Sequence, residues 1–139
     1  MLNYTTTIAA EKTASEIGTI LAKGGAASVS TMFETGKPVG IGFSLRTPHG
    51  DRHFELPVNV DGVMAALKAD RRTSARQRER AQAERTAWRV TKDWIAAQVA
   101  LVEAQMATLD EVMLPYLMVD AGRTLYAVYV ANEQKAIGA

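Results

Sequence analysis

Apolar and polar residues alternate between two turn-forming segments of the chain, TGKP and TPHGD. The side chains at Val39, Ile41, Phe43 and Leu45 are apolar, and those between them are glycine or polar. This alternation is typical of a strand with one buried face. SVSTMFE, before the first turn, is rich in β-forming residues, and residues 52–58, after the second, alternate again. Three short runs joined by two tight turns predict an antiparallel meander.

Helical patterns lie on both sides of this meander. Thr13 and Glu16 form a capping-box pattern ahead of an apolar stripe, and Gly24-Gly25 supplies a left-handed stop, which together predict a helix. The segment before Thr13 is either a loose arm or an edge strand. After the meander, Asn59 is placed to cap a short helix over residues 60–69.

The longest helical pattern begins near Arg76 and predicts a helix of seven or eight turns. A polar loop, residues 70–76, precedes it. Trp88 and Trp94 lie on or beside the apolar stripe, so we interpret them as core residues rather than as stacking platforms for bases. The stripe follows 3-4 spacing and contains Trp88, Thr91, Ile95, Gln98, Val102 and Gln105 or Met106, widened by Ala87, Trp94 and Leu101.

A second capping-box pattern, at residues 108–111, predicts another helix, which Pro115 kinks or ends. Residues 120–123 read as a turn, and the segment after them favours helix over strand. The predicted fold is α+β: a three-stranded antiparallel β-meander packed against a long amphipathic helix, with additional short helices. We expect a single domain over residues 1–139, with residues 1–12 as the candidate flexible arm.

The composition narrows the possible chemistry. The chain has 139 residues, of which 47% are hydrophobic and 22% charged, as in ordinary globular domains. There is no cysteine, which excludes disulfides, thiolate metal sites and cysteine nucleophiles. No apolar run is long enough for a membrane span and no secretory signal is recognisable, so we expect a cytoplasmic protein without a membrane partner.

One row of titratable residues is a candidate metal or acid-base site. His49, Asp51, His53 and Glu55 fall at every second position and would share one face of an extended strand. Pro48 and a glycine place the start of this row in a turn, and the exposed face of any strand looks alike, so we favour a solvated strand face. The chain also lacks P-loop, nucleophile-elbow and dinucleotide motifs. We therefore expect no catalytic residue, no metal, no cofactor and no enzymatic activity.

The charge is unevenly distributed. The net charge is only +1, yet residues 68–92 carry nine basic and three acidic residues, and the remaining residues carry a net charge of −5. On the long helix, Arg78, Arg85, Arg89 and Lys92 would share a face about 20 Å long, matching several successive phosphates. Arginine suits bidentate phosphate contacts. The predicted nucleic-acid-binding residues of this segment are Arg71, Arg72, Arg76, Arg78, Arg85, Arg89 and Lys92.

Two other interpretations of this segment stay open. Arginine, glutamine and glutamate are good helix formers, and Glu79 or Glu84 would neutralise neighbouring arginines, so the segment would then be a solvated helix face. The partner could also be a protein with an acidic face.

The segments GKPVGIGFSLRTPHGDRHFELPVNVDGVMAALK and AERTAWRVTKDWIAAQVALVEAQMATLDEVMLPYLMVDAGRTLY carry a resemblance. They look like a group of small uncharacterised proteins encoded by phages and prophages, which implies a context of replication and recombination. The meander followed by a long helix is also similar in architecture to Rad52-type single-strand annealing proteins, although this chain inserts the helix at residues 60–69. That similarity implies that Arg46 and Arg52 line the groove beside the helix arginines.

The leading hypothesis is a non-enzymatic protein of phage type that binds single-stranded nucleic acid, with DNA expected first, and self-associates to aid annealing or recombination. Replacing Arg85, Arg89 and Lys92 by glutamate should then abolish binding and leave thermal stability nearly unchanged. The alternative is a small oligomeric interaction or structural protein with no nucleic-acid activity, whose long helix packs against its own copies.

Overall fold

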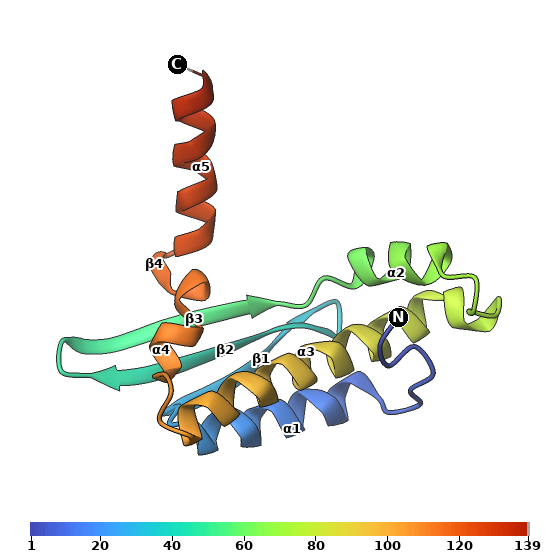
Figure 1. Ribbon diagram of the computed structural model, residues 1–139, viewed down its shortest axis with the longest axis horizontal. Helices are drawn as coiled ribbons and strands as arrows, with labels where there is room; N and C mark the ends of the chain where they lie inside the picture. The colour runs from blue at the N-terminus through green and yellow to red at the C-terminus, as the bar shows by residue number, and fades with distance from the viewer. Residues whose placement is uncertain (139) are drawn as a thin grey trace.

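In the computed structural model, which describes residues 1–138, an antiparallel sheet packs one face against two long helices (Figure 1). The sheet has the strand order β1–β2–β3 and consists of β1 (Ser28–Glu34), β2 (Lys37–Thr47) and β3 (Gly50–Pro57). The two helices, α1 (Ala10–Lys23) and α3 (Arg80–Glu103), lie side by side. The predicted α+β class and the meander are confirmed.

The register of the sheet explains the alternation in the sequence. Phe43 of β2 pairs with Val29 of β1 and with Phe54 of β3, and the two phenylalanine rings stack with centroids 4.9 Å apart. A side chain at Gly40 would place its Cβ 2.8 Å from the carbonyl oxygen of Leu56. The glycine therefore permits close strand packing. On the opposite face, His53 and Glu55 of β3 are exposed, whereas Ser44 of β2 is buried and its hydroxyl lies 2.5 Å from that of Ser28.

Helix α1 begins at Ala10, three residues before the predicted capping box. Thr13 is fully buried one turn inside the helix, and its hydroxyl donates to the carbonyl of Ala9 at 3.4 Å. Glu16 extends sideways to α3 instead of back to the helix start. The capping-box prediction was therefore wrong, whereas the predicted stop at Gly24-Gly25 is confirmed.

The long helix is shorter at both ends than predicted. At its start, a 3-10 turn, η1 (Arg76–Arg78), precedes α3. At its end, α3 stops at Glu103, so Gln105 and Met106 lie beyond it. Trp88 and Ile95 are fully buried, and the indole nitrogen of Trp88 donates to the carbonyl of Pro38 at 3.3 Å. The part of the stripe around Trp88 and Ile95 thus packs in the core, whereas Leu101 and Met106 are exposed.

The N-terminal segment forms no strand. It runs along α3, where Gln82 donates to the carbonyls of Tyr4 and Thr6, both at 3.0 Å, and Thr86 donates to the carbonyl of Asn3. These contacts join residues 3–6 to α3.

The other predicted elements follow in order. Helix α2 (Val60–Ala69) is capped by the side chain of Asn59, which accepts from Gly62 at 2.8 Å, as predicted. The second capping box places a helix correctly, although Thr108 makes no side-chain cap. The remaining elements are α4 (Leu109–Val112), η2 (Leu114–Tyr116), β4 (Met118–Asp120), β5 (Arg123–Thr124) and α5 (Leu125–Gly138).

The chain after residue 120 turns into a helix that stands away from the rest of the protein (Figure 1). This confirms the preference for helix there. Its main contacts are with η2 and β5 at its base. Among the described residues, no helix combines the length and the apolar character needed to cross a membrane.

Candidate nucleic-acid interface

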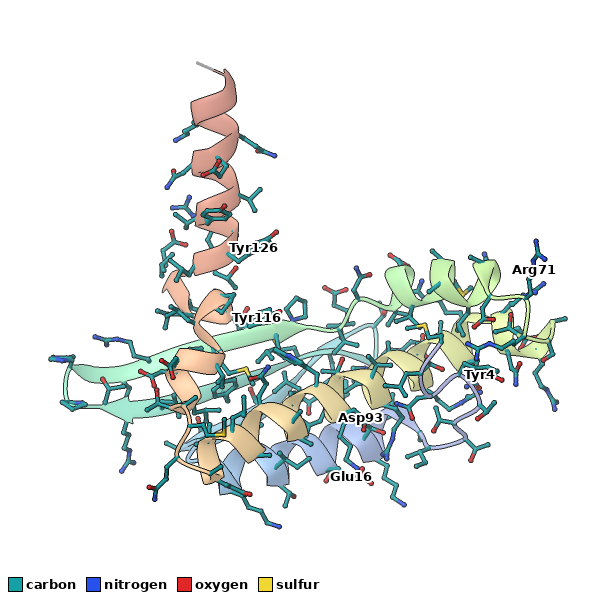
Figure 2. All side chains as sticks on the ribbon, viewed as in Figure 1. Tyr4, Glu16, Arg71, Asp93, Tyr116 and Tyr126 are labelled. Atoms are coloured by element: carbon teal, nitrogen blue, oxygen red, sulfur yellow. The ribbon has the colours of Figure 1, made fainter. Side chains whose placement is uncertain are left out.

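The predicted arginines lie at separate places on the molecule. Arg71 is at the outer end of α2, whereas the turn between β2 and β3 lies at the opposite end (Figures 1 and 2). Arg46 and Arg52 flank that turn. Arg46 and Arg52 therefore lie at the opposite end of the molecule from Arg71.

Arg89 and Lys92 of α3 face α1 instead of solvent. Glu16 accepts from Arg89 at 2.7 Å and from Lys92 at 2.8 Å. The two basic side chains are only 16% and 24% exposed, respectively. The hydrogen bond from Lys92, followed by that from Arg89, lowers the pKa of Glu16. The two cations do share a helix face, as predicted, but they tie α3 to α1 and present no free row to phosphates.

Arg85 is also engaged within the protein. Its guanidinium donates to the side-chain oxygen of Gln82 at 2.7 Å, and Gln82 in turn holds the N-terminal segment. Its Nε is buried and has no hydrogen-bond partner in the described part of the chain. Arg85 is thus half-buried, contrary to its predicted place on an exposed face.

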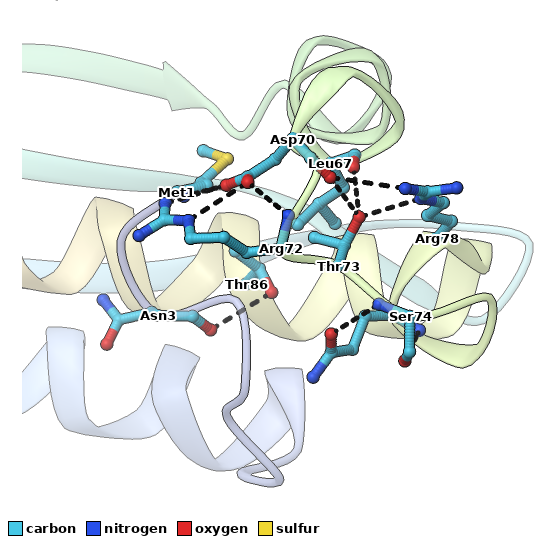
Figure 3. A network of polar contacts seen from close by, with 10 residues as sticks. Met1, Asn3, Leu67, Asp70, Arg72, Thr73, Ser74, Arg78 and Thr86 are labelled. Carbon is cyan, nitrogen blue, oxygen red and sulfur yellow. Dashed lines mark hydrogen bonds and ion pairs between the residues drawn. The ribbon is translucent and has the colours of Figure 1, made fainter.

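The loop between α2 and η1 is ordered by one carboxylate, that of Asp70 (Figure 3). Asp70 accepts from the backbone and the guanidinium of Arg72 at 2.8 to 3.1 Å, and from the amino group of Met1 at 2.6 Å. The hydrogen bond from the Arg72 side chain, followed by that from Met1, holds the pKa of Asp70 far below its usual range. Arg72 also lies over the ring of Tyr4, 5.3 Å from its centroid.

A second set of contacts fixes the other half of this loop (Figure 3). The buried hydroxyl of Thr73 lies 2.7 Å from the carbonyl oxygens of both Leu67 and Asp70. Arg78 donates from Nε to the Thr73 oxygen at 2.8 Å. Arg72 and Arg78 thus stabilise the conformation of the loop through hydrogen bonds within the protein. From the sequence, both had been predicted to bind nucleic acid.

The cations that remain face outward. Residues 68–80, which we call the basic corner, carry six basic and two acidic residues. Lys68, Arg71 and Arg76 are exposed there and form no ion pair with any described residue. Arg80 pairs with Asp61 and approaches Glu84. The basic corner therefore presents three exposed cations that form no ion pair with any described residue, on a loop held by hydrogen bonds.

Three residues of this corner were not predicted from the sequence. Lys68 was included in the charge of the basic segment but was not predicted to bind nucleic acid. Its place in the last turn of the predicted helix over residues 60–69 could have indicated that it belongs to the site. Asp70 and Thr73 organise the loop. The spacing of Asp70 and Arg72 at i and i+2 is common in turns stabilised by aspartate, and would have indicated the first of these roles.

The row of His49, Asp51, His53 and Glu55 lies exposed along the turn and β3. Asp51, His53 and Glu55 border a hollow of about 640 Å³ between β3 and β4. Among the described residues, no group of three or more histidine or acidic side chains is placed to hold a metal ion.

No protein-family model, curated protein or solved structure matches the chain. The resemblance to phage proteins and the architectural similarity to annealing proteins thus stay predictions. What the chain binds must be argued from its own geometry.

Proposed function

We propose that the protein binds single-stranded nucleic acid, with DNA as the first candidate, through the basic corner and without catalysing a reaction. The observation that supports this most is the outward position of Lys68, Arg71 and Arg76 on a loop whose backbone is internally braced. The single-strand preference and the role in annealing or recombination rest on the sequence resemblance alone.

The braced loop favours binding for a physical reason. A flexible arginine loses conformational freedom when it binds, and a loop already fixed by Asp70 and Thr73 loses less. Arginine forks bind phosphate oxygens bidentately, so Arg71 and Arg76 suit the nucleic-acid backbone. Contacts of this kind are independent of base sequence, because they reach phosphates rather than base edges.

The test is fluorescence anisotropy with a labelled single strand of about 30 nucleotides, and the matching duplex alongside. We expect the double substitution Arg71→Glu and Arg76→Glu to weaken single-strand binding by at least about tenfold at low salt. The matched control is Arg46→Glu with Arg52→Glu, which changes the net charge equally at the other end of the molecule.

The two variants distinguish binding through the basic corner from a general dependence on the net charge of the protein. Near-normal binding by the Arg46 and Arg52 variant, with a large loss in the other, supports the basic corner. Equal losses would show that net charge matters rather than this site. No binding by the unmodified protein at low salt would overturn the proposed function.

The alternative hypothesis placed a self-interface on the long helix. On this stripe Trp88 and Ile95 are fully buried, whereas Leu101 and Met106 near its far end are 36% and 72% exposed. A self-interface of this kind would therefore be confined to the end of the stripe near Met106.

A further inference from the structure

Helix α5 has an apolar surface that the rest of the described chain leaves largely uncovered. Its first seven residues, from Leu125 to Ala131, are Leu, Tyr, Ala, Val, Tyr, Val and Ala, so they are apolar on every side of nearly two turns. Tyr126 and Tyr129 are 59% and 58% exposed. Figure 2 shows Tyr126 on the free-standing part of the helix. A helix that is apolar all round is normally buried.

The length of α5 makes the same point. It has 14 residues, and isolated helices shorter than about 12 to 15 residues are marginal in water. Within the described chain, its main neighbours are η2 and β5 at its base. At that base, Leu114, Pro115, Leu125, Tyr126 and Tyr129 line an apolar hollow of about 340 Å³. A helix with this sequence and so few contacts needs a covering surface.

We propose that this surface is α5 of a second copy, packed antiparallel about a two-fold axis near Val128. In such a pair, residues whose numbers sum to the same value lie opposite each other, so Tyr126 faces Val130 of the second copy. Every contact within the seven apolar residues is then apolar against apolar.

Charge complementarity favours this occupant and this direction. The same crossing brings Glu133 of one copy opposite Arg123 of the other. It also brings Lys135 close to Asp120. Asp120 and Arg123 lie just before α5, and Glu133 and Lys135 lie in its second half, so there is one acidic and one basic residue near each end. Arg123 and Asp120 pair with each other at 2.8 Å, but both side chains are about half exposed and so remain accessible to the charges of a second copy. A parallel pair would instead put like charges side by side, which is unfavourable.

The size of the surface sets the expected strength. A 14-residue helix is about 21 Å long and about 10 Å wide. The area that one face of it can bury is therefore well below the roughly 800 Å² per partner of a standard interface. We therefore expect a reversible dimer with a dissociation constant in the micromolar range. This proposal does not rest on nucleic-acid binding and is measured without nucleic acid.

The first experiment is sedimentation velocity over a concentration series spanning the micromolar range. The unmodified protein should pass from monomer to dimer, and Tyr126→Ser with Tyr129→Ser should stay monomeric. The matched control is Phe33→Ser with Met106→Ser, which removes apolar side chains that are 57% and 72% exposed at places away from α5, and it should dimerise normally. A shared main unfolding transition would show that all three proteins are folded.

The second experiment tests the antiparallel direction by charge exchange. Arg123→Glu alone and Glu133→Arg alone should each weaken the dimer several-fold, and the two together should restore it. The proposal is overturned if the unmodified protein stays monomeric, if the tyrosine variant still dimerises, or if the exchanged pair is no better than the single variants.

Discussion

At the scale of single residues, Glu16 determines which cations of α3 are available to a ligand. It accepts from both Arg89 and Lys92, so these two cations of the row expected from the helical spacing are neutralised by a residue 73 and 76 positions away in sequence. No local pattern contains this information, because the pairing exists only when α1 packs beside α3. For the same reason, reversing the charge of Arg89 and Lys92 should destabilise the protein, contrary to the expectation drawn from the sequence.

The substitution Glu16→Gln tests this role through its pH dependence. The folded protein lowers the pKa of Glu16, mainly through the hydrogen bond from Lys92. A lowered pKa contributes stability that is fully present above the unfolded value of about 4.3 and is lost as the pH falls through the folded value. We therefore expect the variant to melt at a lower temperature than the unmodified protein at neutral pH, with the difference vanishing in acid.

The measurement is thermal unfolding followed by circular dichroism from neutral to strongly acidic pH. Glu55→Gln is the control, because Glu55 is exposed on β3 and forms no ion pair with any described residue. A constant difference in melting temperature across the whole pH range would contradict the ion-pair role of Glu16.

At the scale of elements, the local patterns predicted where helices and strands lie better than how they end. The meander was predictable because both turns carry glycine or proline and because Val39 to Leu45 alternate strictly. Neither capping box forms its predicted side-chain bonds, since Thr13 is buried inside α1 and Thr108, although it precedes α4, makes no side-chain cap. For the first box, tertiary contacts decide the outcome, because Glu16 pairs with Arg89 and Lys92 of α3 instead of reaching back to the helix start.

The end of α1 offers a test of a helix stop that was predicted correctly. Gly25 has a φ of 107°, a conformation that costs a residue with a side chain about 1–2 kcal/mol, and a Cβ there would meet no atom within 4 Å. We expect Gly25→Ala to lower the free energy of unfolding by about this amount, through the backbone alone.

Gly122→Ala is the matched control, because a Cβ at Gly122 also meets no atom within 4 Å and its φ lies outside the positive range. Denaturant unfolding of both variants gives the comparison. Equal losses would mean that the left-handed conformation of Gly25 is not what stops the helix.

At the scale of the whole molecule, the sequence predicted the asymmetry of charge but not its distribution in space. The basic segment does lie at one end of the protein, yet Arg72 and Arg78 brace a loop, and Arg85 turns toward Gln82. Separating ligand-facing from structural arginines requires the packing of α1, α3 and the N-terminal segment. Arg46 and Arg52 were misplaced because the length of the hairpin carries them to the far end.

This distribution predicts how strongly salt should weaken nucleic-acid binding. For single strands, the logarithm of the binding constant falls with the logarithm of salt concentration by about 0.7 for each phosphate neutralised. Seven bound cations, as expected from the sequence, would give a slope of about −5, whereas Lys68, Arg71 and Arg76 alone give about −2. We expect the shallower slope in an anisotropy titration at several salt concentrations, unchanged in the Arg46→Glu, Arg52→Glu variant. A slope near −5 would mean that Arg89 and Lys92 leave Glu16 to bind phosphate, and that the helix face, rather than the basic corner, is the interface.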